Sequence, residues 1–244
     1  MKNYTLALLC ALPMTFSVVP GSVAAADAPA AFNLAKGRTA LVVTDPQNDF
    51  LDPKGIAYGL FADNLKELNA IENMEQLFKA AKKSGMAVFV SPHGYFPHDH
   101  EWENPGALQK QLLSLGVFGR KDSVYAKDLN GAGADFLARY KPYILDGKTV
   151  VTSPHKVYGP NSNDLILQLR SRGVDTVMLA GLAANLCTDS HLRELVENGF
   201  KVVVVKDAVG ATGADAYKAA VTNYGFIANA VWNTDEAVKA MAHY

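Results

Sequence analysis

Four short apolar runs recur along the chain and predict buried strands of a parallel sheet. They are Thr39–Thr44, Met86–Ser91, Thr176–Ala180 and Lys201–Lys206. Each run is continuous and mostly β-branched rather than alternating, as expected where helices cover both faces of a sheet. Weaker runs at Thr149–Thr152 and Ala230–Trp232 are further strand candidates.

Between these runs, apolar residues recur at three- and four-residue steps, which is the period of an amphipathic helix. The clearest pattern begins at Leu65 and stops at Gly85. Others cover Asn163–Arg172, Leu186–Asn198, Ala214–Tyr224 and Thr234–Ala242. Strands that alternate with helices predict an α/β fold with an open, mostly parallel sheet and helices on both faces.

The N-terminus has the pattern of a secretory signal peptide. Lys2 gives a positive start, an apolar run follows to Val19, and small residues at 24–26 precede Asp27. A membrane anchor is the alternative, but the run is shorter than the ~20 residues that span a bilayer. We therefore expect a signal peptide over residues 1–26, one domain over residues 27–244, and a periplasmic or secreted protein.

Composition changes this picture little. The chain has 23 Lys and Arg against 24 Asp and Glu, for a formal net charge of −1. No long run of one sign occurs, so neither nucleic acid nor a membrane surface is expected as a partner of the mature protein.

The cysteine count is more informative. The chain has 2 cysteines, Cys10 and Cys187, and the first lies in the predicted signal peptide. Cys187 would then be the sole thiol of an exported protein, so no intramolecular disulfide can form. Such a thiol is either buried and inert, part of an intermolecular bridge, or reactive.

Three side chains of complementary chemistry follow predicted strands, where sites form in open parallel sheets. They are Asp45, Lys156 and Cys187. A thiol needs a proton acceptor to become a nucleophile, which Asp45 can supply, and an ammonium group at Lys156 can stabilise the thiolate. Asn185 is a candidate N-cap of the helix that begins near Cys187. Alone, Asp45 could be a turn former and Lys156 a surface residue; together with the lone thiol they favour a reactive site.

The segments that contain these residues are "LVVTDPQNDF", "SPHKVYG" and "AGLAANLCTDSHLRELVENGF". In combination they resemble the isochorismatase-like cysteine hydrolases, which include nicotinamidases and N-carbamoylsarcosine amidases. The resemblance implies a Rossmann-like fold with Asp45, Lys156 and Cys187 as the catalytic triad. It also implies a cis peptide between Leu182 and Ala183, and an oxyanion hole formed by the backbone N–H groups of Ala183 and Cys187.

By the same resemblance, we expect hydrolysis of a C–N bond in a small amide, ureide or carbamoyl compound through a thioester at Cys187. No cofactor is expected, and relatives are commonly dimers or tetramers, so a homo-oligomer is expected. The alternative is a small-molecule-binding protein that kept the fold and lost the reaction.

The segment 91–106 offers a second candidate site. His93, His98 and His100 suggest zinc or iron ligands, but Ser91 stands where nicotinamidases carry a metal-binding Asp two residues before a His. We therefore predict no metal here and interpret the segment as a polar loop around a substrate pocket. His93, Tyr95, Phe96, Trp102 and His191 are the candidate pocket residues. His191, four residues after Cys187, could instead act as a base or simply pack.

Overall fold

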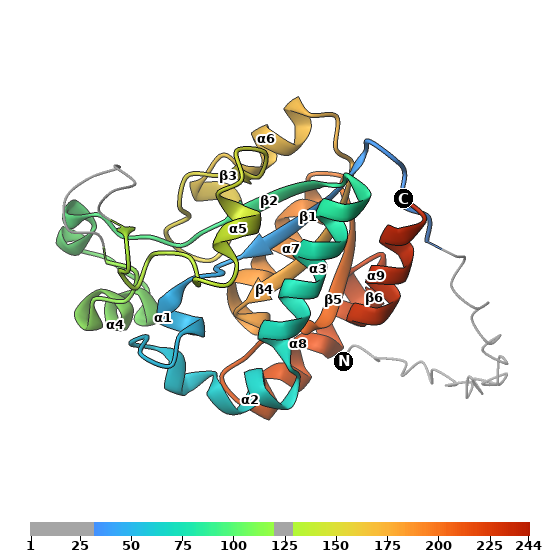
Figure 1. The fold of residues 1–244 in the computed structure, drawn as a ribbon. Coiled ribbons are helices and arrows are strands. Elements are labelled where there is room, and N and C mark those ends of the chain that lie inside the picture. The colour runs from blue at the N-terminus through green and yellow to red at the C-terminus, as the bar shows by residue number, and fades with distance from the viewer. Residues whose placement is uncertain (1–31, 120–128) are drawn as a thin grey trace, which may run out of the picture. The chain divides into compact units, whose positions relative to one another are not determined.

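The computed structural model describes residues 32–119 and 129–244, so the predicted signal peptide lies outside the described residues. Six parallel strands form one sheet in the order β3-β2-β1-β4-β5-β6, as Figure 1 shows. They are β1 (Thr39–Thr44), β2 (Ala87–Ser91), β3 (Val150–Val151), β4 (Thr176–Leu182), β5 (Lys201–Gly210) and β6 (Ala230–Trp232). All six predicted strands are confirmed, and β4 and β5 run further than their apolar runs.

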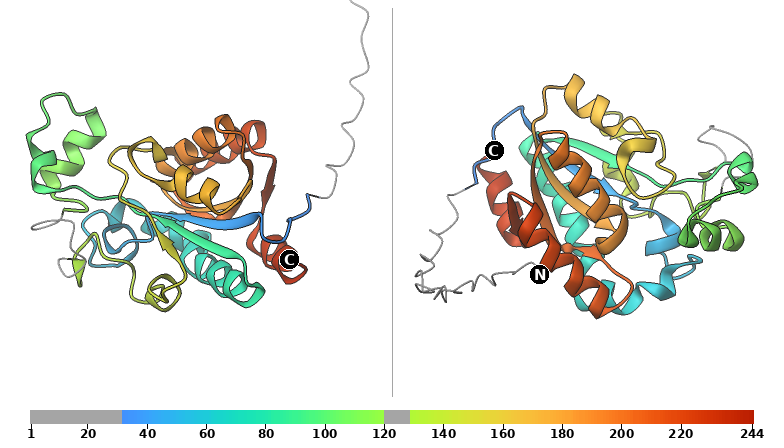
Figure 2. Two further views of the ribbon diagram at one scale, coloured as in Figure 1. Left: turned by 90° about the horizontal axis from the view of Figure 1, so that it is seen from above. Right: turned by 180° about the vertical axis from the view of Figure 1, so that it is seen from behind.

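Helices cover both faces of the sheet, as predicted (Figure 2). One face packs against α3 (Ala70–Ser84) and α9 (Thr234–Ala242), and the other against α6 (Leu165–Ser171), α7 (Asp189–Glu197) and α8 (Ala214–Ile227). Neighbouring residues of β1 face opposite layers: Leu41 packs in the first core and Val42 in the second, and both are fully buried. This burial on both faces explains why the strands appear in the sequence as continuous apolar runs.

The helix predicted from Leu65 to Gly85 is in fact two helices. α2 (Ala62–Glu67) ends before Asn69, whose φ of 50° is left-handed, and α3 begins at the next residue. Asparagine tolerates this conformation better than most residues, so the chain turns there without losing its apolar spacing. Gly85, also left-handed, ends α3 as predicted.

Several short elements were not predicted. They are the helices α1 (Asn48–Leu51), α4 (Ala107–Leu115) and α5 (Lys141–Ile144), and the 3-10 turns η1 (Tyr58–Leu60), η2 (Pro97–Glu101) and η4 (Pro160–Ser162). Most of them lie in the long connections that leave the carboxyl ends of β1 and β2. Among the described residues, no helix is long and apolar enough to cross a membrane.

The strand order locates the site. β1 pairs with both β2 and β4, so successive crossovers diverge on either side of β1. Ligands bind at such a switch point, just beyond the carboxyl ends of the strands. Asp45 follows β1 directly, and Cys187 follows β4 by five residues.

Candidate active site

Asp45 is held by the end of the sheet. It is fully buried with a φ of 50°, and its backbone N–H donates to the carbonyl of Ser91 at 3.1 Å. A non-glycine residue with positive φ is uncommon, and such backbone is frequent at functional sites. Its Oδ1 accepts a hydrogen bond from His155 Nε2 at 2.8 Å, whereas Oδ2 has no hydrogen-bond partner in the described part of the chain.

Cys187 lies in an unusual turn. The peptide between Leu182 and Ala183 is cis, which confirms the expectation, and residues Ala184–Thr188 form a π-helical turn, η5. This turn precedes α7, so the cysteine is not in the first turn of an α-helix. Asn185 was predicted to be the N-cap, but Ala183 occupies that position and its side chain forms no capping hydrogen bond. π-Helical turns are rare and often occur at functional sites.

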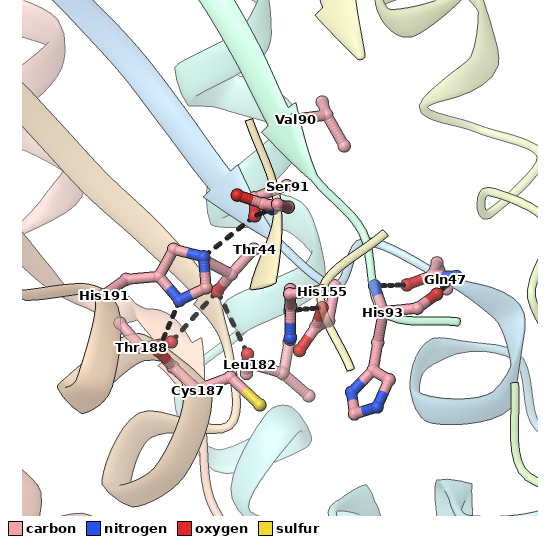
Figure 3. A network of polar contacts seen from close by, with 12 residues as sticks. Thr44, Gln47, Val90, Ser91, His93, His155, Leu182, Cys187, Thr188 and His191 are labelled. Atoms are coloured by element: carbon pink, nitrogen blue, oxygen red, sulfur yellow. Dashed lines mark hydrogen bonds and ion pairs between the residues drawn. The ribbon is translucent and has the colours of Figure 1, made fainter. Parts of the chain in front are cut away.

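Thr44 ties this turn to the end of β1. Its hydroxyl group donates to the carbonyl of Leu182 at 3.0 Å and contacts the hydroxyl of Thr188 at 3.2 Å (Figure 3). The two strands approach so closely that a Cβ on Gly181 would lie 2.1 Å from the carbonyl oxygen of Thr44. Gly181, with a φ of 115°, therefore has to be glycine.

His155, a residue that was not predicted to be catalytic, lies beside Asp45. The imidazole of His155 is fully buried, and its backbone N–H donates to Pro92 at 2.9 Å, which fixes the loop after β3 against the loop after β2. The ammonium group of Lys156 pairs with the buried carboxylate of Asp99 and lies 3.9 Å from the centre of the Phe96 ring. The structure thus brings Asp45 and Cys187 together, as expected, and pairs Lys156 with Asp99.

His191 fastens the cysteine turn to the sheet. Its Nδ1 lies 2.7 Å from the carbonyl oxygen of Cys187, which can only accept, so Nδ1 carries the proton and donates. Its Nε2 then accepts from the hydroxyl of Ser91 at 2.8 Å, and Ser91 accepts from Asn163. Burial and the nearby His155 lower the pKa of His191 to about 3, so it is neutral here. Both ring nitrogens are occupied, which leaves none for substrate.

His93 reaches the site from the loop after β2. It is 1% exposed, and its ring packs against Tyr95, Phe118 and His155. The side chain of Gln47 holds the backbone of His93 through two hydrogen bonds. The His93 N–H donates to Gln47 Oε1 at 2.8 Å, and Gln47 Nε2 donates to the His93 carbonyl oxygen at 2.9 Å. Gln47 was not among the predicted residues, although it lies in the "TDPQNDF" segment. Burial and then the charge of His155 lower the pKa of His93 well below its ordinary value.

The other histidines of this loop lie elsewhere. His98 and His100 are exposed on η2, whereas His93 is buried. Within residues 32–119 and 129–244, the one group of three or more potential metal ligands comprises Asp45, His93, His155 and Cys187, and includes neither His98 nor His100.

A small cavity of about 50 Å³ opens beside the thiol. Its lining comprises Phe50, Ala57, Leu60, Phe61, His93, Leu108, Leu112, Val157, Tyr158, Ala183, Leu186, Cys187 and Thr212. His93 and Cys187 are among the expected residues. Tyr95 and His191 are fully buried and do not line it, and Trp102 packs edge-on against Tyr95. Phe50 and Tyr158 were missed, although both lie within or beside the segments that contain Asp45 and Lys156. A larger hollow between α3 and α9 lies away from these groups.

The thiol is protonated in this environment. Burial and then the negative charge of Asp45 raise the pKa of Cys187 well above its ordinary value. The backbone N–H groups of Ala183 and Cys187 act in the opposite direction and stabilise the anion. A carboxylate and two backbone N–H groups therefore act on one thiol in opposite directions.

A parallel sheet that sets a buried thiol beside a carboxylate at its switch point is the framework of a cysteine hydrolase. The isochorismatase domain family matches residues 39–236, most of the chain. The protein belongs to this family and, with it, to the isochorismatase-like hydrolases.

Related proteins agree with this assignment. The chain is 26% identical over 208 residues to the ureidoacrylate amidohydrolase RutB of Variovorax paradoxus, a match that covers 84% of this chain and 81% of the relative. Its fold is similar to a cysteine hydrolase from Pseudomonas syringae pv. phaseolicola (TM-score 0.70, 20% identity, 90% and 99% covered). It is also similar to N-carbamoylsarcosine amidase from Thermoplasma acidophilum (TM-score 0.59, 22% identity, 81% and 97% covered).

Proposed function

We propose that the protein hydrolyses a C–N bond of a small amide, ureide or carbamoyl compound, with Cys187 as nucleophile and Asp45 as proton acceptor. The observation that carries this proposal is that the ligand-type atoms of Asp45 and Cys187 lie within 4.8 Å of each other, both buried, beside one cavity. The amidohydrolase name of the RutB relatives supports the C–N bond as the target.

The reaction would proceed in two halves. Asp45 takes the thiol proton as the sulfur attacks the carbonyl carbon, and the protonated carboxyl group then gives this proton to the departing nitrogen. The C–N bond breaks and a thioester forms at Cys187. In the second half, Asp45 takes a proton from water, whose oxygen attacks the thioester, and the thiol is regenerated with release of the acid.

The backbone N–H groups of Ala183 and Cys187 would form the oxyanion hole. Both groups act to lower the pKa of the Cys187 thiol, so a carbonyl oxygen bound next to that sulfur would meet the same donors. Donors that are fixed before the reaction stabilise the developing oxyanion without having to reorganise.

We assign the third position of the site to His155 in place of the expected Lys156. His155 Nε2 donates a hydrogen bond to Asp45 Oδ1. Asp45 Oδ2, which has no hydrogen-bond partner in the described chain, is then the oxygen that accepts the proton. Lys156 would act indirectly, because its ammonium group pairs with the carboxylate of Asp99.

The cavity favours a neutral substrate with an apolar group. Its lining is dominated by aliphatic and aromatic side chains, and no Lys or Arg occurs among the described residues that form it. A charged acid such as the substrate named for the RutB relatives would find no ion-pair partner among them. Small neutral carboxamides are therefore the first class to test.

The deciding experiment is a screen for ammonia release. Neutral aliphatic and aromatic amides should be compared with ureidoacrylate, using Cys187→Ala as control. A substrate that is turned over should leave an acyl group on Cys187, detectable by mass spectrometry after rapid acid quench. If neutral amides bind to the folded protein without turnover or acylation, the alternative of an inactive binding protein holds.

Export is a separate proposal that rests on the N-terminal sequence pattern. A leader over residues 1–26 would deliver the domain to the periplasm or outside the cell, where an unpaired thiol survives best when it is buried. At 5% exposure, Cys187 meets that condition.

A further inference from the structure

Four buried groups that can bind a metal meet at the carboxyl ends of the strands. Asp45, His93, His155 and Cys187 each offer one ligand atom, and these atoms all lie within 4.8 Å of one another. They come from four segments: the end of β1, the loops after β2 and β3, and the π-helical turn η5. Figure 3 shows His93, His155 and Cys187 converging on one region. The fold, and not a local motif, assembles this cluster.

Several of these donor atoms have no partner within the described residues. Asp45 Oδ2, His155 Nδ1 and both ring nitrogens of His93 form no hydrogen bond there. Buried polar atoms are normally satisfied, and each exception requires an explanation. Proton transfer accounts for Asp45 Oδ2. It gives no role to the His93 ring, which packs between aromatic rings with two unpaired nitrogens.

We propose that these four residues form a zinc site that holds the enzyme in an inactive state. One thiolate, two imidazoles and one carboxylate are ligands that Zn²⁺ accepts in tetrahedral sites. Tetrahedral ligands around zinc lie roughly 3.3–3.8 Å apart, so the four donors have to move together only slightly. The thiolate and the carboxylate together balance the charge of the ion, and its burial therefore leaves no net charge in the site.

Zinc and catalysis exclude each other in this arrangement. When the ion binds, the thiol releases its proton to solvent and the sulfur lone pair forms the Zn–S bond. The thiolate can then no longer attack a carbonyl, and Asp45 can no longer accept a proton. The ion is thus a reversible inhibitor and not a cofactor, so a chelator should preserve or raise activity. This consequence rests on the proposed function, whereas zinc binding does not.

Cobalt(II) is the probe for the test, because tetrahedral Co²⁺ absorbs strongly in the visible and a thiolate ligand adds a charge-transfer band in the near ultraviolet. We expect the full chain to bind one equivalent with both features, and Zn²⁺ to displace it. His93→Phe keeps the aromatic packing and removes one ligand. It should weaken cobalt binding by more than about tenfold, because even residues that only hydrogen-bond to a metal ligand lose about that much metal affinity when they are replaced. Cys187→Ala should abolish the thiolate band.

The matched controls are His98→Ala and His100→Ala, which remove exposed imidazoles from the same loop and should leave cobalt binding unchanged. Cobalt binding without a thiolate band, or an unchanged cobalt affinity in His93→Phe, would overturn the site. A second measurement does not depend on any variant: equimolar Zn²⁺ should block alkylation of wild-type Cys187, and a chelator should restore it. Absence of protection would also reject the site. Neither measurement uses turnover, so each is independent of the proposed reaction.

Discussion

The Nε2 atom of His155 lies 2.8 Å from Oδ1 of Asp45, and both side chains are completely buried. Lys156, the next residue along the chain, pairs with Asp99 instead. A step of one residue on a loop changes which side chain enters the site and which remains at its edge. The two residues can therefore be separated by mutation.

We predict that His155→Ala slows turnover by about two orders of magnitude or more, since Asp45 loses the donor that orients it. His155→Asn retains an amide donor and should recover part of the rate. Lys156→Met should stay within about tenfold of wild-type turnover, because the ammonium group that it removes pairs with Asp99 and lies over the Phe96 ring. Steady-state turnover, with folding checked by circular dichroism, measures all three. Equal losses in His155→Ala and Lys156→Met would return Lys156 to the site.

Alkylation should report the thiol's environment independently of turnover. Because the pKa of Cys187 is raised, iodoacetamide should react slowly at neutral pH, with a rate that continues to climb above the pH at which free cysteine levels off. Asp45→Asn removes the negative charge that opposes ionisation, so its profile should shift toward lower pH. The shape of the pH profile, not the absolute rate, is the measurement, since burial also slows the reagent.

The same variant should be a poor catalyst. Asp45→Asn is expected to slow turnover by about two to four orders of magnitude, although its thiol ionises more readily. Combined with Cys187→Ala, it should be scarcely worse than Cys187→Ala alone, because residues that act in one step do not give additive losses. An Asp45→Asn enzyme with a lower thiol pKa and normal turnover would show that Asp45 is not the proton acceptor.

The strands of the sheet can be predicted from the sequence because each one is a short, continuous run of apolar residues. Two-sided burial makes β1, β4 and β5 continuous apolar runs, and their carboxyl ends then place Asp45 and Cys187 at one edge. The cis peptide before Ala183 came from the family resemblance and is present. Lys156 could not be distinguished from His155 in the same way, because the loop after β3 has no periodicity that says which side chain points inward. That choice depends on the bond from His155 N–H to Pro92, a contact across 63 residues.

The predicted signal peptide has a direct test. We expect the exported protein to begin at Asp27, since the small residues at 24–26 form the cleavage site. Intact mass of the protein recovered from the periplasm or the medium distinguishes this product from the full chain. An exported product that still contains residues 1–26 would contradict the assignment.

His191 should make stability depend on pH. Its pKa is about 3 in the folded protein, against an ordinary value of 6.5. As the pH falls below 6.5, the unfolded chain binds a proton at this residue that the folded protein does not, so the free energy of unfolding decreases. The decrease should approach about 1.4 kcal/mol per pH unit and continue until the pH nears the folded value. His93, whose pKa is also lowered, should add to the loss in the same direction.

Two variants separate this titration from the hydrogen bonds that accompany it. His191→Asn can still donate to the carbonyl of Cys187 but no longer titrates, so its stability should depend less steeply on pH between 6.5 and 3. Ser91→Ala leaves Nε2 of His191 without its donor and should cost about 1–3 kcal/mol at neutral pH while keeping the wild-type slope. Urea unfolding at several pH values measures both quantities. If His191→Asn and Ser91→Ala share the wild-type slope, His191 does not set the acid sensitivity of the fold.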